Sequence, residues 1–265
     1  MKIIKTAFSG SKANRVKEIM ELIRSDNYKR VVEVFGGSCV ISNNLLKEKI
    51  VDEAVANDYD HYFDKFEEYI EFKRDLVEKL LNLGFEKVKN KKLSKEKQEI
   101  LQDLLKDQES NLLKYLSKNF VFSCRRAAGT MKIEDFIYFM NEIEVDNDIE
   151  YIKNLRNVGL DSLDYIDFME KYIKNNDKNT IVIVDPPYLN SSQKQYGNEF
   201  FGLEKTIKLL NVLKDKGNNF IFFNQKKEDS IELLKLYGFD FIYSTKQVSM
   251  SGATKREDFM AYVKF

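Results

Sequence analysis

Hydrophobic residues follow two different spacings along this chain. Near both ends, short runs of β-branched and aromatic residues alternate with segments whose apolar residues recur every three or four positions. The first spacing is typical of buried strands and the second of amphipathic helices. We therefore predict helices at 14–24, 41–49, 203–216 and 228–237, and strands at 30–35, 53–56, 180–184, 219–223, 239–244 and 259–265. Such alternation predicts an α/β fold, with a Rossmann-like sheet covered by helices on both faces.

The middle of the chain departs from this alternation. From about Tyr62 to Leu116 the residues are long-chained, charged and free of proline, and their apolar positions recur at helical intervals. Residues 87–97 are basic and either form a loop or cover a solvated helix face. We predict one α/β domain formed by residues 1–64 and 151–265, with a mostly helical insertion at 65–150.

Composition narrows the class of protein. The chain has 43% hydrophobic and 32% charged residues, as a soluble globular protein does. No apolar run approaches the ~18 residues needed to span a membrane. The N-terminus lacks a signal peptide's apolar core, and two distant cysteines suggest no disulfide framework, so we expect a cytoplasmic protein. With one histidine we expect no metal site. Zero net charge means that any nucleic-acid contact must be local.

The segment Asp185-Pro186-Pro187-Tyr188 directly follows the predicted strand 180–184. In open α/β sheets, ligands bind beyond the carboxyl ends of the strands. The two prolines, the only ones in the chain, stiffen the turn and remove its N–H groups. A carboxylate, a bare carbonyl and an aromatic ring together suit a planar amine, whose two N–H bonds the oxygens can accept. The competing interpretation is an ordinary strand-to-loop turn.

A second group of candidate residues follows the first two predicted strands. The strand 31–35 runs into the turn Gly36-Gly37-Ser38, where a backbone without side chains can approach a ligand closely. The turn lacks the three spaced glycines of the dinucleotide pattern. Asp58 follows the second strand, where an acid accepts hydrogen bonds from ribose hydroxyls in nucleotide-binding units. A turn residue or helix cap explains Asp58 equally well.

Motif by motif, and over most of its length, the chain resembles the Dam-type, D12 class DNA adenine-N6 methyltransferases. The motifs occur in the family's order: an N-terminal aromatic-x-Gly-small-Lys element, a glycine-rich cofactor loop, a ribose-binding acid, an acid–aromatic pair and the catalytic D-P-P-Y. In this chain they are Phe8 to Lys12, Phe35 to Cys39, Asp58, Asp164-Tyr165 and Asp185 to Tyr188. Asp161 is a weaker candidate for the acid of the pair.

The resemblance implies S-adenosylmethionine as the cofactor and a flipped-out adenine in double-stranded DNA as the substrate. It implies cofactor contacts by Phe8, Lys12, Phe35, Gly36, Gly37, Ser38, Cys39, Asp58, Asp164 and Asp185. It also implies catalysis by Asp185, Pro186, Pro187 and Tyr188, and recognition of the DNA target by the insertion. Cys39 stands where the family usually has a second glycine, which bears on cofactor affinity more than on the fold.

The sequence gives less specific signals for the DNA contacts and for the biological setting than for the cofactor and the catalytic turn. Arg125 and Arg126, preceded by aromatic residues, are the candidates for phosphate or guanine contact, although a surface pair is an equally ordinary interpretation. The resemblance implies a bacterial or phage protein, with a restriction endonuclease as one candidate partner.

Two alternatives stay open. The amine-binding turn also suits RNA or a protein glutamine amide, although Asp at 185 and the large insertion favour DNA. Cys39 and the neutral charge also fit a catalytically impaired DNA-binding protein on a methylase scaffold.

Overall fold

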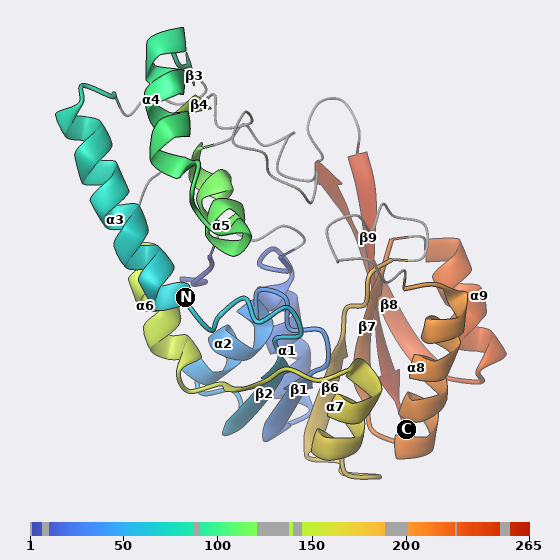
Figure 1. Cartoon of the computed structure of the whole chain (residues 1–265). Helices are drawn as coiled ribbons and strands as arrows, with labels where there is room; N and C mark the ends of the chain where they lie inside the picture. The colour runs from blue at the N-terminus through green and yellow to red at the C-terminus, as the bar shows by residue number, and fades with distance from the viewer. Residues whose placement is uncertain are drawn as a thin grey trace. The chain divides into compact units, whose positions relative to one another are not determined.

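The computed structural model describes residues 2–6, 11–86, 91–120, 138–139, 145–188, 201–225, 227–249 and 255–265. The chain forms two compact units (Figure 1). The first contains Met1–Ile3, Lys12–His61 and Asn154–Phe265, and the second contains Ile4–Ser11 and Tyr62–Lys153. No helix among the described residues is long and apolar enough to cross a membrane.

A seven-stranded sheet forms the centre of the first unit. Its strands are β1 (Arg30–Glu33), β2 (Glu53–Asn57), β5 (Gly159–Asp161), β6 (Thr180–Val184), β7 (Phe220–Asn224), β8 (Asp240–Ser249) and β9 (Lys255–Lys264). Their order is β5-β2-β1-β6-β7-β9-β8, and β9 alone runs antiparallel to its two neighbours. The order reverses between β1 and β6, and ligands bind at such a reversal, beyond the carboxyl ends of the strands.

Helices cover both faces of this sheet, as the sequence predicts. On one face, α7 (Tyr165–Tyr172), α8 (Leu203–Lys216) and α9 (Lys227–Leu236) pack with Val32 and Val182 in one apolar cluster. Glu33 points to the opposite face, because successive strand residues alternate, and there it accepts hydrogen bonds from Ser42 of α2 (Val40–Lys47). The helix α1 (Val16–Ser25) packs against α2. The predicted Rossmann-like α/β fold is therefore confirmed.

Element boundaries lie within two residues of the predicted ones, except that β8 ends five residues later and β9 begins four residues earlier than predicted. The helix α8 has the predicted bounds, and Gly217 ends it with a φ of 65°. The strand β8 is longer than the predicted 239–244, since it pairs with β9 as far as Ser249 opposite Lys255. Residues 245–249 are mostly polar, so a prediction based on hydrophobic runs ends the strand too early.

The second unit is mostly helical. It contains α3 (Phe66–Asn82), α4 (Lys95–Leu105), α5 (Ser110–Phe120) and most of α6 (Val145–Leu155), with a short pair of strands, β3 (Lys91–Lys92) and β4 (Tyr138–Phe139). Within the basic stretch 87–97, residues 87–90 lie outside the described part. Lys91 and Lys92 form β3, and α4 begins at Lys95.

A buried polar cluster holds this unit together. The Asp148 carboxylate accepts hydrogen bonds from Lys73 Nζ at 2.8 Å, from the Tyr115 hydroxyl at 2.7 Å and from Thr6 Oγ1 at 3.2 Å. All four residues are buried. Thr6 belongs to the N-terminal segment Ile4–Ser11, so this segment is bound to the helical unit through Asp148.

Replacing Asp148 tests the importance of this cluster. We expect Asp148→Ala to lower the free energy of unfolding by about 3–5 kcal/mol, because it takes the counter-charge away from the buried ammonium of Lys73. Urea denaturation measures the change. Asp103→Ala is the matched control, since it removes an ion pair with Lys106 in which both side chains are exposed. Equal midpoints for the two variants would contradict a stabilising role for the cluster.

Candidate active site

Three turns meet at the carboxyl edge of the sheet, beside the reversal of strand order. In the parallel ladders, Glu33 of β1 pairs with Ala56 of β2 on one side and with Ile183 of β6 on the other. Because the three strands are in register, they end at the same level. The glycine turn after β1, the Asn57-Asp58 pair after β2 and the Asp185 to Tyr188 segment after β6 therefore emerge side by side.

The glycine turn is packed tightly against β2. Gly36 N donates to the Asn57 carbonyl oxygen at 3.0 Å, and a Cβ on Gly36 would lie only 2.7 Å from that oxygen. Only glycine therefore fits at position 36. Gly37 has a φ of 50°, which also favours glycine. Gly37 is exposed at the surface of the turn and Ser38 is buried beside it.

Cys39 is the N-cap of α2 and fills the inside of this turn. Its backbone is left-handed, with a φ of 51°, and its side chain is fully buried. Burial raises the pKa of the thiol well above its usual value, and the nearby Glu33 and Asp58 carboxylates raise it further. A thiol in this state is a poor nucleophile. Cys39 therefore acts as a small packing residue.

The neighbouring acid, Asp58, is buried at the end of β2, and its N donates to the Asp161 carbonyl at 2.7 Å. The Asn57 side chain bonds the backbone of Leu163 twice, accepting from its N at 3.0 Å and donating to its O at 2.9 Å. These bonds fix the loop between β5 and α7 beside the turns. Asp164 lies on that loop, is exposed and caps α7 by accepting from Ile166 N at 2.9 Å.

Asp161, the last residue of β5, and Phe35, at the start of the glycine turn, are held by local contacts. Asp161 accepts from Lys171 and from the Tyr172 hydroxyl, both at 2.7 Å. Phe35 stacks on Tyr165 with ring centroids 5.8 Å apart, and Phe201 meets it edge-on at 5.4 Å.

Asp185 is bound by a lysine from the N-terminal part of the chain. Lys12 Nζ lies 2.5 Å from Asp185 Oδ2, and these side chains are 9% and 21% exposed. The same ammonium lies over the rings of Tyr188, at 5.4 Å, and Phe223, at 5.2 Å. Burial raises the pKa of Asp185, while the Lys12 charge opposes that rise, and the net shift is upward. Lys12 therefore favours the ionised carboxylate at a buried position.

Glu33 is a site residue that the sequence analysis missed. It is buried, and it accepts from Ser42 N at 3.1 Å and Ser42 Oγ at 2.5 Å. Burial raises its pKa to about 7, with a further contribution from the Asp185 charge. The available signal was an acid inside the otherwise apolar run 31–35, because buried strands rarely contain an ionisable residue without a specific reason.

Three predicted site residues, Phe8, Arg125 and Arg126, lie outside the described part of the chain. The structure brings together Lys12, the turn 35–39, Asp58 and the segment Asp185 to Tyr188. Asp164 lies at the edge of this group, on the loop held by Asn57. Among the described residues, no group of three or more histidine, cysteine, aspartate or glutamate side chains is placed to hold a metal ion.

Comparison with known proteins gives a family match and distant structural likenesses. The sequence model of the D12 class N6 adenine-specific DNA methyltransferases matches residues 8–250. A Haemophilus influenzae protein named "Putative methyltransferase" is 26% identical over 213 residues, which cover 77% of this chain and 68% of that protein.

Among solved structures, a Pyrococcus horikoshii protein described as a "putative RNA methyltransferase" aligns with a TM-score of 0.44 and 13% identity, over 96% of this chain and 86% of its own. The N-terminal domain of human METTL16 in complex with SAH aligns with a TM-score of 0.40 and 10% identity, over 95% of this chain and 68% of its own. Likenesses this distant carry no information about the substrate.

The raised pKa of Glu33 predicts a pH dependence of stability. Since the pKa in the folded state is about 7 and the usual value is 4.5, the folded protein keeps a proton that the unfolded chain releases. The resulting stabilisation is complete below pH 4.5 and is lost as the pH rises through 7. Relative to Glu33→Gln, the free energy of unfolding of the wild type should therefore fall by about 3 kcal/mol between pH 4 and 8.

Urea denaturation at several pH values measures this difference. Ser42→Ala removes a donor that favours the charged carboxylate, so it should make the fall steeper. If the free energy of unfolding changes with pH in the same way in the wild type and in Glu33→Gln, the pKa of Glu33 is not raised on folding.

Proposed function

The chain belongs to the D12 class N6 adenine-specific DNA methyltransferases, and on that premise we propose that it methylates the exocyclic amine of adenine in double-stranded DNA. The methyl donor of this methyltransferase is S-adenosylmethionine. The observation that carries the proposal is the position of Asp185, at the carboxyl edge of β6, next to the reversal of strand order. A DNA adenine is the substrate that the family match supports best.

The residues at the sheet edge fit S-adenosylmethionine. This cofactor carries a sulfonium charge, an ammonium group and ribose hydroxyls, all of which favour acceptors and negative charge. The edge presents the buried carboxylates of Glu33 and Asp58 beside a turn whose glycines allow close backbone approach. We infer that Asp58 accepts from the ribose and that the turn 36–38 faces the cofactor. When bound, the cofactor supplies an activated methyl group.

Asp185 and Pro186 would prepare the amine for transfer. In adenine the lone pair of N6 is delocalised into the ring, so the amine is a poor nucleophile. When the Asp185 carboxylate and the Pro186 carbonyl accept its two hydrogens, the nitrogen becomes more tetrahedral and its lone pair is exposed. The same oxygens stabilise the positive charge that develops on N6. Asp185 must be ionised to act in this way, and the Lys12 charge favours that state.

Tyr188 would hold the base outside the duplex. An amine inside a base pair is out of reach, so the nucleotide must be flipped out, at a cost of a few kcal/mol. Stacking on an aromatic ring recovers about 1–3 kcal/mol per base. The rigid Pro186-Pro187 turn keeps the Tyr188 ring and the Asp185 carboxylate at a fixed spacing, which orients the reacting nitrogen.

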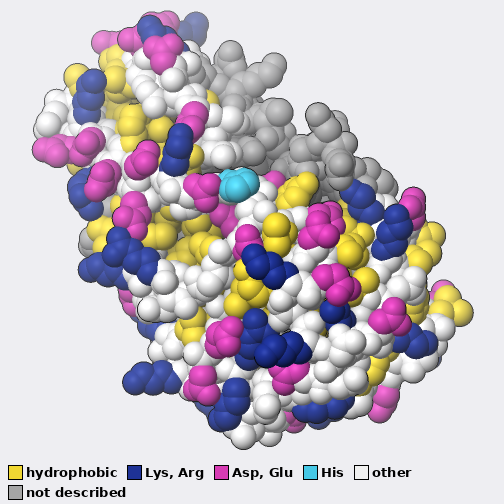
Figure 2. Space-filling model, turned by 60° about the horizontal axis from the view of Figure 1, so that its bottom comes forward, with side chains coloured by type: hydrophobic (Ala, Val, Ile, Leu, Met, Phe, Trp, Pro, Cys, Tyr) yellow, Lys and Arg dark blue, Asp and Glu magenta, His cyan; other side chains and the backbone are white. Residues whose placement is uncertain are grey.

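Target recognition is part of the same proposal and is assigned to the helical unit. The insertion 65–150 includes Arg125 and Arg126, our candidates for phosphate or guanine contact. Figure 2 shows basic and acidic side chains interspersed over the face that it draws, in keeping with a zero net charge. Binding to DNA would therefore depend on a few local cations rather than on an extended basic surface. A restriction endonuclease that cuts the unmethylated site would be a matching partner, in the cytoplasm of a bacterium or a phage-infected cell.

Transfer of labelled methyl groups tests the function. We expect label from the cofactor in N6-methyladenine of duplex DNA, and we expect Asp185→Ala to reduce the rate by about 10²–10³ or more, because it removes the main acceptor for the amine. Nucleoside analysis identifies the product, and circular dichroism checks that the variant is folded. RNA and protein are included as substrates in parallel. Label in RNA or protein alone would overturn the proposal.

The pH dependence of transfer tests the role of Lys12. Because activity requires the ionised Asp185, the rate should rise with pH through the pKa of this carboxyl group. Lys12→Gln removes the charge that lowers this pKa, so the rising limb should move to higher pH and part of the lost rate should return there. Lys12→Arg keeps the charge and is the control. If the rate of Lys12→Gln rises over the same pH range as that of the wild type, Lys12 does not set the ionisation of Asp185.

A further inference from the structure

Asp258 contacts the final residue of the Asp185 to Tyr188 segment. The Tyr188 hydroxyl donates to Asp258 Oδ1 at 3.2 Å. Asp258 is buried on β9, where the next residue, Phe259, pairs with Asn224 at the end of β7. Since β7 lies beside β6 and runs parallel to it, Asp258 is at the same edge of the sheet as Asp185.

The position of Asp258 is fixed by Arg15, whose side chain is fully buried. Arg15 Nε donates to Asp258 Oδ2 at 3.1 Å, and Arg15 Nη2 donates to the Asp258 backbone oxygen. One guanidinium therefore holds both the side chain and the backbone of residue 258, which its planar fork of donors makes possible. The contact joins residues far apart in sequence, 15 and 258.

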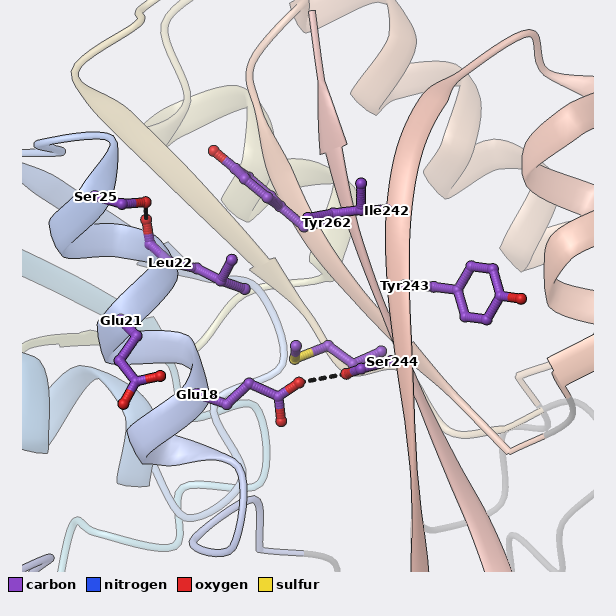
Figure 3. Close-up of a pocket in the computed structure, with 9 residues that line it drawn as sticks. Glu18, Glu21, Leu22, Ser25, Ile242, Tyr243, Ser244 and Tyr262 are labelled. Carbon is purple, nitrogen blue, oxygen red and sulfur yellow. Dashed lines mark hydrogen bonds between the residues drawn. The ribbon is translucent and has the colours of Figure 1, made fainter.

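The guanidinium is itself held by further polar groups. Arg15 Nη1 donates to Glu18 Oε2 at 2.8 Å and to Ser244 Oγ at 2.9 Å. Figure 3 shows Glu18 of α1 and Ser244 of β8 joined by a hydrogen bond across the space between the helix and the strand. The Arg15 side chain therefore has little freedom to turn away from Asp258.

A single backbone turn links this arrangement to Lys12. Arg15 N donates to the Lys12 carbonyl oxygen at 2.8 Å, so the two cations lie on one turn before α1. Lys12 binds Asp185 directly, and Arg15 acts on Tyr188 through Asp258. The turn from Lys12 to Arg15 therefore restrains both ends of the Asp185 to Tyr188 segment.

We propose that Asp258, held by Arg15, is a positioning residue that sets the orientation of the Tyr188 ring for the target base. This inference rests on the proposed function, in which Tyr188 stacks on the flipped adenine. A tyrosine side chain rotates about two torsions, and a hydrogen bond from its hydroxyl to a fixed carboxylate restricts both. The ring is then oriented before the base arrives, and binding need not order it.

Stability alone is a weak explanation for this buried pair. Removing a guanidinium and a carboxylate from water costs free energy that their attraction often fails to recover, and apolar residues of similar volume are frequently as stable. A role in fixing one conformation of a functional side chain accounts for a buried ion pair at this position. The Tyr188 side chain, which Arg15 and Asp258 hold in place, also borders the proposed site of the target base.

The orientation of Tyr188 can be measured without methyl transfer. Protein labelled with 3-fluorotyrosine gives ¹⁹F resonances for its 14 tyrosines, and the Tyr188 signal is assigned by its loss in Tyr188→Phe. We expect Asp258→Ala to move the Tyr188 signal toward the position of unfolded protein. In that variant Arg15 keeps Glu18, Ser244 and the backbone oxygen of residue 258 as acceptors. An unchanged Tyr188 signal would overturn the proposal.

Single-turnover methyl transfer then tests the consequence for the reaction. Asp258→Ala and Tyr188→Phe should each slow the step by about tenfold, the value of one lost hydrogen bond to a charged group. The double variant should be no slower than Tyr188→Phe alone, because that variant already lacks the hydroxyl that Asp258 binds, together with its hydrogen bond to Asp185. The KM for the cofactor should not change. A purely structural role for Asp258 would instead lower stability and leave the single-turnover rate of the folded protein unchanged.

Asp26→Ala is the matched control. Asp26 also accepts a hydrogen bond from a tyrosine hydroxyl, that of Tyr262, which lies on the same strand as Asp258. Neither Asp26 nor Tyr262 contacts Tyr188 through a described hydrogen bond. This variant should leave the Tyr188 signal and the rate unchanged. If Asp258→Ala does not fold, Tyr188→Phe removes the bond to Asp258 together with the bond to Asp185, and an undiminished rate there would overturn the proposal.

The two proposals can fail separately. Absence of methyl transfer by the wild type to DNA, RNA and protein would refute the function, while the ¹⁹F spectra would still decide whether Asp258 orients Tyr188. A shifted Tyr188 signal with an unchanged rate, in a wild type that is active, would refute the positioning role alone.

Discussion

The arrangement of this site depends on the balance between acids and cations at one edge of the sheet. Glu33, Asp58, Asp185 and Asp258 converge there, and all are buried or partly buried. Lys12 and Arg15, from one turn, pair with two of these acids. The charge of Asp185 raises the pKa of Glu33, and Lys12 lowers it. A concentration of carboxylates at this edge suits a positively charged cofactor, since opposite charges close together attract.

The register of the parallel strands makes this concentration of charge possible. Glu33 ends β1, and Asp58 and Asp185 directly follow β2 and β6, so these three acids emerge at one level of the sheet. Asp258 reaches the same edge from the antiparallel strand β9. The glycine turn contributes in the same way, because the backbone contact between Gly36 and Asn57 leaves no room for a side chain. The same strands and turns therefore form the sheet and position the residues of the site.

Local patterns predicted the parts of the site that depend on local chemistry. The D-P-P-Y turn, the glycine turn and Asp58 follow strands that are visible as apolar runs, and the sheet places these turns together. Arg15 and Asp258 carried no such signal, because a charged residue at a helix start or in an edge-proximal strand is ordinary. Their contact spans nearly the whole chain and exists only in the folded state. Glu33 was visible within its strand, but the strand pattern alone gave it no role.

The N-terminal segment has a consequence for exchanging the helical unit between such proteins. Thr6 is bound to Asp148 in the helical unit, and Lys12, six residues later, is bound to Asp185 in the sheet unit. A recombination event that exchanged only residues 62–153 would separate Asp148 from the threonine that it binds. A transferable copy of the helical unit must therefore be discontinuous and include residues 4–11, and chimeras that exchange residues 62–153 alone would lose this anchor.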